Sequence, residues 1–150
     1  MDELCLPPFE YKVKKQGGVL FIFDMIRKKY VVLTPEEWVR QHVVHYLVGH
    51  KGYSPAVVAV EREIDLFGMS RRFDVVAFGN DGNPRLLVEC KAPSVALSRQ
   101  VFDQAFRYNI VLAAPYVAVT NGICHYCGRV DKARGFVFLD DFPPAAPAGL

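Results

Sequence analysis

Two kinds of hydrophobic spacing divide this chain into helices and strands. Apolar residues recur at helical spacing after Thr34, which predicts an amphipathic helix over about 35–49. Thr34 has the side chain of an N-cap, and Glu37 stands where the second partner of a capping box is expected. A second stripe of the same period predicts a helix over about 99–113, with Ser98 as its N-cap.

Shorter runs, in which apolar and polar residues alternate between turn signals, predict strands. Residues 1–33 contain two or three of them, with a turn at Gly17-Gly18. Three more lie between the helices and further ones follow the second helix, at about 57–66, 72–78, 85–91, 116–120, 123–130 and a last short run at 136–139. The core order of helix, three strands, helix and two strands predicts an α/β protein, an α+β mixed sheet with helices on its faces.

Length and composition narrow the class of protein. A chain of 150 residues predicts a single domain over 1–150, made of an N-terminal β extension (1–33), a core (34–140) and a loose tail rich in Pro and Ala (143–150). No apolar run reaches the roughly 20 residues of a membrane span. The N-terminus is acidic and lacks the order of a secretory signal, so we expect a cytoplasmic protein with no membrane partner.

Charge and cysteine content exclude fewer classes of protein. Lys and Arg number 18 against 16 Asp and Glu, a milder excess than in proteins that only coat nucleic acid, although a local basic patch suffices for a site-specific enzyme. The cysteines are expected to be reduced thiols. One C-x-x-C pair, Cys124 and Cys127, is a weak zinc signal, because residues three apart in a strand point to opposite faces.

The segment 72–91 can be analysed as a hairpin. Asn80-Asp-Gly-Asn83 is a strong tight-turn signal, and counting outwards from it places Phe78 opposite Arg85 and Asp74 opposite Glu89. Directly opposed residues share a face of the sheet, and two carboxylates so placed normally destabilise it. A bound cation removes that penalty. Lys91, two residues beyond Glu89, shares the same face.

This arrangement favours a hard divalent cation. Mg²⁺ takes one or two carboxylates together with waters and phosphate oxygens, and Mn²⁺ is a usable substitute. Asp74 and Glu89 are the expected ligands, and the backbone carbonyl of Cys90 is a further oxygen donor. Lys91 would orient the attacking water or stabilise charge on phosphorus. The alternative is a solvated surface cluster, which the apolar residues flanking both strands disfavour.

The same residues carry a family resemblance. Phe73-Asp74, fourteen intervening residues and Glu89-Cys90-Lys91 resemble the motif of the PD-(D/E)xK nuclease superfamily. Gln104-Ala-Phe-Arg-Tyr108 resembles the Q-x-x-x-Y motif that follows the lysine in type I restriction subunits. Most of the chain, from Thr34 to Gly122, is similar to the N-terminal nuclease domain of type I restriction R subunits. The resemblance implies a restriction-endonuclease-like core that hydrolyses DNA with Mg²⁺, most simply as an endonuclease.

The resemblance also suggests roles for residues beyond the motif. Gln104 would position substrate or water, and Glu37 on the first helix would add a carboxylate to the metal, with Glu36 as second choice. Glu37 has a structural explanation in the capping box. Glu61 and Glu63, on the strand before the hairpin, either border the metal or form a solvated strand face. No G-x-x-x-x-G-K-[ST] phosphate loop is present in this sequence, so the resemblance covers the cutting domain without a motor.

Partners follow from the same reasoning. Arg71 and Arg72 adjoin Asp74 and are expected to contact backbone phosphates, and Arg107 and Tyr108 are further candidates for nucleic-acid contacts. DNA is favoured over RNA only through the resemblance. A homodimer or a partner in a restriction complex is expected, because one site cuts one strand. The alternative function is a non-catalytic module that binds nucleic acid or serves assembly in such a complex.

Overall fold

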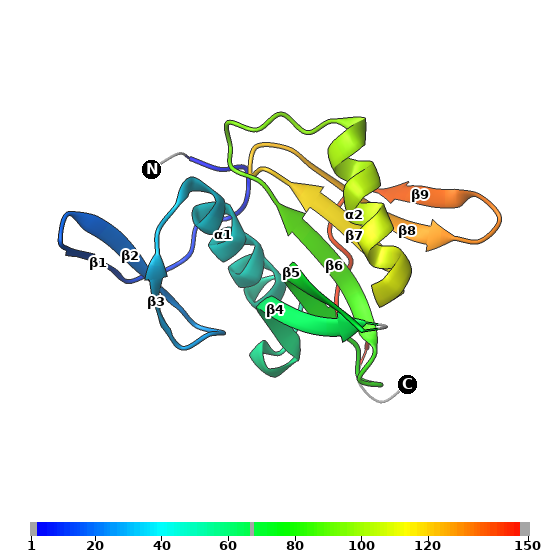
Figure 1. Ribbon diagram of the computed structural model, residues 1–150, viewed down its shortest axis with the longest axis horizontal. Helices are drawn as coiled ribbons and strands as arrows, with labels where there is room; N and C mark the ends of the chain where they lie inside the picture. The colour runs from blue at the N-terminus through cyan, green and yellow to red at the C-terminus, as the bar shows by residue number, and fades with distance from the viewer. Residues whose placement is uncertain (1–2, 67, 148–150) are drawn as a thin grey trace.

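The computed structural model of the chain describes residues 3–66 and 68–147. They form two sheets and two α-helices (Figure 1). The N-terminal sheet has the order β1-β2-β3, with strands Val13–Gln16, Val19–Asp24 and Lys29–Val32. The helices are α1 (Pro35–Gly49) and α2 (Arg99–Leu112). The larger sheet is formed by β4 (Val58–Leu66), β5 (Met69–Phe78), β6 (Pro84–Cys90), β7 (Tyr116–Thr120), β8 (His125–Asp131) and β9 (Gly135–Leu139).

The six-stranded sheet runs in chain order from β4 to β9. Only the β6–β7 pair is parallel, since α2 connects these two strands, and the other pairs are antiparallel. Val75 and Val88 pack in one cluster with α1, whereas Val76 and Leu87 pack in another with Leu112 of α2. Neighbouring strand residues point to opposite faces, so the helices cover opposite faces. The predicted mixed α/β sheet is confirmed.

The hairpin of β5 and β6 has the predicted register at its site end and another at its turn. Val75 pairs with Val88 and Val76 with Leu87, and Asp74 and Glu89 are the next residues beyond the last of these pairs. Near the turn the prediction was wrong, because Phe78 pairs with Pro84 and not with Arg85. The register shifts between Ala77 and Phe78. Such an irregularity absorbs one residue without moving the pairs beyond it.

The start of α1 follows half of the predicted capping box. Thr34 Oγ1 accepts a hydrogen bond from the Glu37 N–H at 3.0 Å. The Glu37 carboxylate does not complete the box, because it accepts hydrogen bonds from Arg27, Arg40 and Gln41 instead. This buried polar network attaches the N-terminal sheet to the first helix.

The segment predicted as a loose tail is hydrogen-bonded where it begins. The Pro143 carbonyl accepts from the Tyr53 hydroxyl at 2.9 Å, and the Pro144 carbonyl accepts from Arg85 at 2.8 Å. The Ala145 N–H donates to the carbonyl of Lys51. The last part of the predicted tail, 148–150, lies outside the described residues. Among the described helices, none is long and apolar enough to cross a membrane.

Candidate metal and nucleic-acid site

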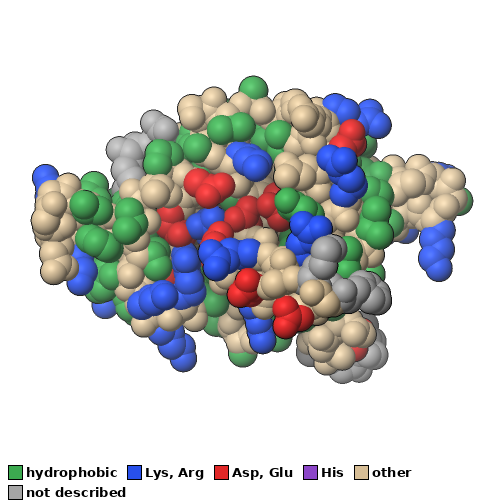
Figure 2. Space-filling model, in the orientation of Figure 1, with side chains coloured by type: hydrophobic (Ala, Val, Ile, Leu, Met, Phe, Trp, Pro, Cys, Tyr) green, Lys and Arg blue, Asp and Glu red, His purple; other side chains and the backbone are tan. Residues whose placement is uncertain are grey.

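Asp74, Glu89 and Lys91 line one cavity of about 230 cubic ångströms. Asp74 lies on β5 and Glu89 near the end of β6, and Lys91 is the first residue after β6. The predicted convergence of these three side chains is therefore present in the structure. The other residues that line the cavity come from α1, β5 and α2: Glu36, Arg72, Val101, Gln104, Ala105 and Tyr108. Figure 2 shows acidic and basic side chains gathered beside one another at the middle of this face.

The two carboxyl groups of the hairpin differ in their affinity for a proton. Burial and the neighbouring Asp74 carboxylate raise the pKa of Glu89 to about 9. Burial alone would raise the pKa of Asp74, but hydrogen bonds with Glu89, the Cys90 N–H and Arg40 hold it below its ordinary value. In the metal-free site at neutral pH, Glu89 therefore keeps a proton and Asp74 carries the charge. The buried Oε1 of Glu89 has no hydrogen-bond partner within the described structure.

Arg40 of α1 connects most of the acidic side chains around the site. Its Nη2 lies 2.9 Å from Asp74 Oδ1 and 2.8 Å from Glu61 Oε1. Its Nη1 lies 2.6 Å from Glu37 Oε1. The arginine side chain is only 5% exposed. Burial alone would lower the pKa of Arg40, but the carboxylates of Glu37 and Asp74 raise it above its ordinary value. The guanidinium therefore stays charged. One buried cation thus offsets much of the acidic charge.

Glu61 reaches Arg40 from an irregular point of β4. Val60 pairs with Val75 and Arg62 with Phe73, but no pair forms between Glu61 and Asp74. Glu61 has a φ of 51°, a region that costs energy for any residue with a Cβ. Burial raises the pKa of Glu61, and Arg40 opposes that shift. The strained backbone brings this carboxylate to Arg40, which also contacts Asp74, although Glu61 is not among the residues that line the cavity.

The two candidate acids of the first helix occupy different places. Glu36 lines the cavity. Glu37 is buried and contacts Arg27 at 2.7 Å and Arg40 at 2.6 Å, and it is not among the residues that line the cavity. The carboxylate of Glu37 is thus already neutralised by two arginines. Within residues 3–66 and 68–147, no three or more His, Cys, Asp or Glu side chains are arranged to hold a metal ion.

The helix α2 forms the other wall of the site. Gln104 donates a hydrogen bond to the Tyr108 hydroxyl at 3.1 Å, and both side chains line the cavity. The Arg71 guanidinium lies 5.8 Å from the centre of the Tyr108 ring. An adjoining cavity of about 320 cubic ångströms is lined by Arg71, Gln104, Arg107 and Tyr108. Arg72 lies 3.7 Å from Glu61 Oε2. Of the residues predicted to contact nucleic acid, Arg72 and Tyr108 line the cavity of the acidic pair, whereas Arg71 and Arg107 line the adjoining one.

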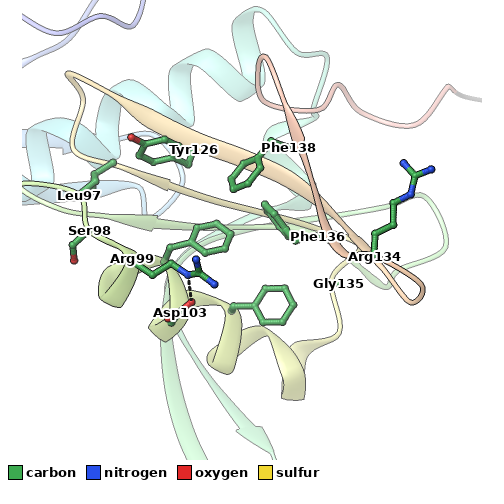
Figure 3. Close-up of a pocket in the computed structure, with 11 residues that line it drawn as sticks. Leu97, Ser98, Arg99, Asp103, Tyr126, Arg134, Gly135, Phe136 and Phe138 are labelled. Atoms are coloured by element: carbon green, nitrogen blue, oxygen red, sulfur yellow. Dashed lines mark hydrogen bonds and ion pairs between the residues drawn. The ribbon is translucent and has the colours of Figure 1, made fainter.

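A different cavity, of about 550 cubic ångströms, lies on the far side of α2 (Figure 3). Aromatic side chains of α2, β8 and β9 line it, and Arg99 and Arg134 stand among them: Phe102, Phe106, Tyr126, Phe136 and Phe138. Phe102 and Phe136 meet edge to face with ring centres 4.7 Å apart. Among the described residues that line it, Asp103 is the one carboxylate, so this cavity lacks the acidic pair of the first site. Of the C-x-x-C pair, Cys124 is exposed and Cys127 is buried in the core.

Sequence reasoning missed Arg40 altogether. Its only local signal is the spacing from Glu36 and Glu37, four and three residues earlier on the helix. Its contact with Asp74 spans 34 residues of sequence, and its contact with Glu61 also depends on how α1 packs against β4 and β5. The four residues predicted as catalytic, Asp74, Glu89, Lys91 and Gln104, line one cavity, but the prediction lacked the arginine that balances their charge.

Comparisons with known proteins give this chain a family and a related fold. The chain matches the family described as type I restriction enzyme R protein N terminus over residues 35–143. No curated protein matches the chain. Among solved structures, it is similar to a fragment of a putative HsdR subunit of a type I restriction enzyme from Vibrio vulnificus YJ016, with a TM-score of 0.53 and 20% sequence identity. That similarity covers 75% of this chain and 24% of the other, and at this identity it shows the fold alone.

The matched residues 35–143 contain both helices, all six strands of the larger sheet and every residue of the cavity described above. The family match thus covers the part of the chain that builds the site. The chain belongs to the family of N-terminal domains of type I restriction enzyme R proteins.

Proposed function

We propose that the chain is a Mg²⁺-dependent nuclease domain that hydrolyses DNA phosphodiester bonds as an endonuclease. The observation that carries the proposal is the convergence of Asp74, Glu89 and Lys91 on one cavity whose second wall holds Gln104. Family membership supports a restriction-type role. It supports DNA as the substrate in the context of a restriction complex, with a homodimer as a further expectation.

The donor set fits a hard divalent cation. Glu89 presents a buried oxygen with no partner within the described structure, beside the charged Asp74 carboxylate. Two carboxylates are what Mg²⁺ commonly takes from a protein, with water and phosphate oxygens as its remaining ligands. When bound, the ion would polarise the scissile phosphate and acidify a bound water. The Cys90 carbonyl is a candidate additional donor, whereas Glu37 is held by its arginine contacts.

The chain's own residues would orient the reactants. Glu89 must release its proton before both carboxylates can bind a cation. Lys91 would hold the attacking water or stabilise negative charge on phosphorus. Gln104, fixed by its bond to Tyr108, would position the water or a phosphate oxygen. Arg71, Arg72 and Arg107 would hold the backbone phosphates on either side.

Plasmid nicking with Mg²⁺ or Mn²⁺ tests the proposal. We expect Asp74→Asn and Lys91→Met to lower the rate about a hundredfold or more. Glu63→Gln is the matched control, because Glu63 is an exposed carboxylate of β4 outside the cavity. Equal cutting by all four proteins would sink the proposal. A labelled RNA of the same sequence tests the preference for DNA, and a linear DNA with blocked ends tests internal cutting.

One observation favours a second function, that of a non-catalytic module that binds nucleic acid or serves assembly in a restriction complex. Both oxygens of Asp74 already have partners, since Oδ1 accepts from Arg40 and Oδ2 accepts from the Cys90 N–H at 2.8 Å. If this alternative holds, calorimetry should detect no binding of Mg²⁺ or Mn²⁺, while DNA binding in EDTA should weaken steeply with salt.

A further inference from the structure

The N-terminal sheet leaves one face open, and that face combines apolar and basic side chains. Directly opposed residues share a face. Lys14 is opposite Phe21, which is opposite Val32, and Phe23 is opposite Tyr30. Val32 is 49% exposed and Tyr30 is 36% exposed, although both are large apolar side chains. The complete open face comprises Lys12, Lys14, Gln16, Val19, Phe21, Phe23, Tyr30 and Val32.

The other face of the same sheet has its partner within the chain around Ile22 and Asp24, whereas Val13 and Leu20 on that face are 45% and 44% exposed. Ile22 is fully buried, and Asp24 is 1% exposed. Gln41 of α1 donates to Asp24 Oδ2 at 3.0 Å. Arg27 contacts Asp24 at 2.6 Å and Glu37 at 2.7 Å. The sheet is therefore held to α1 by buried polar contacts, and its open face is not needed for that attachment.

The charge of this extension is strongly one-sided. Between residues 10 and 33, five exposed lysines stand against one exposed carboxylate, Glu10: Lys12, Lys14, Lys15, Lys28 and Lys29. Asp24 does not offset them, because Arg27 already neutralises it. Lys14 places its ammonium 4.3 Å from the centre of the Tyr30 ring. Figure 2 shows apolar side chains bordered by Lys and Arg at this end of the molecule, on the face that also bears the acidic cluster.

We infer that the open face of the β1–β3 sheet binds single-stranded nucleic acid next to the candidate site, an inference that rests on the proposed function for its choice of ligand. Lysines supply contacts to phosphates, and aromatic rings supply surfaces on which unpaired bases stack. A duplex hides the faces of its bases, so it would leave the apolar part of this surface uncovered. A protein partner would need an acidic and apolar segment, and nothing on this face selects one.

The attachment of the sheet gives the bound strand a fixed relation to the site. Arg27 contacts Glu37, Glu37 contacts Arg40, and Arg40 contacts Asp74, each through a bond of 2.9 Å or less. A strand held on the sheet would therefore lie at a defined position relative to Asp74. The substrate that profits from this geometry is DNA with an unpaired segment beside the bond that is cut.

Fluorescence anisotropy with a labelled oligothymidine of about 20 nucleotides, in EDTA to prevent cutting, tests the inference. Lys12→Ala/Lys14→Ala removes two lysines of the open face. Lys15→Ala/Lys29→Ala is the matched control, because it removes the same charge from the opposite face of the same strands. We expect the first variant to reduce the slope of log affinity against log salt by about 1.4, as two lost phosphate contacts require. The control should change it by less than half as much.

Tyr30→Ser tests the stacking component. We expect single-strand affinity to fall about fivefold or more, with the affinity for a duplex of the same sequence unchanged. Equal losses in the two double-lysine variants would show a general charge effect and overturn the inference. A normal single-strand affinity in Lys12→Ala/Lys14→Ala and Tyr30→Ser would also overturn it, and would leave the face to an acidic protein partner.

The two proposals fail separately in these measurements. Asp74→Asn should bind the oligothymidine as the unmodified protein does, because the sheet lies outside the cavity. If the unmodified protein does not cut DNA but shows the expected lysine and tyrosine effects, the nuclease proposal fails and the binding surface stands. Urea unfolding of each variant checks that its fold is intact, so that a lost affinity is not a lost structure.

Discussion

Replacement of Arg40 by methionine tests the charge balance of the site most directly. The arginine is nearly fully buried and contacts Asp74, Glu61 and Glu37 within 2.9 Å. Methionine keeps much of the side-chain volume but leaves these carboxylates without their shared cation. Removal of one partner from a buried ion pair costs about 3–5 kcal/mol, because the remaining charge stays buried.

The expected loss in the Arg40→Met protein lies at the low end of that range. Glu37 keeps its contacts with Arg27 and Gln41, and Glu61 is 25% exposed and stays near Arg72. Asp74 bears most of the effect. We therefore expect the free energy of unfolding to fall by about 3 kcal/mol. For a domain of this size that corresponds to a drop in Tm of roughly 6–12 °C.

Urea unfolding of the EDTA-treated protein at pH 8, followed by the fluorescence of the single tryptophan, measures this loss. Arg107→Met is the matched control, because Arg107 is an exposed arginine on the other helix. Arg40→Lys should recover part of the stability, since it restores the charge but not the forked geometry. A loss below about 0.5 kcal/mol in Arg40→Met, the size usual for surface changes, would refute the reasoning.

Two further predictions concern the proton on Glu89 in the metal-free protein and the packing around Gly128. The pKa of Glu89 is raised from 4.5 to about 9. Between these two pH values the folded protein keeps a proton that the unfolded chain has lost. The free energy of unfolding therefore falls with rising pH, by up to about 1.4 kcal/mol per pH unit. Glu89→Gln should reduce this slope and be the more stable protein at pH 8 in EDTA, whereas identical pH profiles would contradict the assignment. At the aromatic cavity, a Cβ on Gly128 would lie 2.0 Å from the Phe136 ring, so Gly128→Ala should destabilise by about 1–3 kcal/mol in urea unfolding. Gly49→Ala, where nothing lies within 4 Å, should be neutral or slightly stabilising, and equal effects at both glycines would refute the packing argument.

Much of the site geometry was predictable from local signals. The tight turn and the alternation of the flanking strands predicted Asp74 opposite Glu89, and the neighbouring pairs of Val75 with Val88 and Val76 with Leu87 have the predicted register. The helices were predicted for the same kind of reason. Hydrophobic period, capping residues and turn residues act over a few positions, so one sequence is enough to interpret them.

The sequence alone therefore determined the elements, the mixed sheet and the shared face of the carboxylates and Lys91. Only the tertiary structure decided which charges meet. It selected Glu36 for the cavity and held Glu37 between two arginines, although the residues are neighbours in sequence. It also brought Arg40 to Asp74 and attached one face of the N-terminal sheet to α1. These contacts depend on how distant elements pack, and no local periodicity encodes that packing.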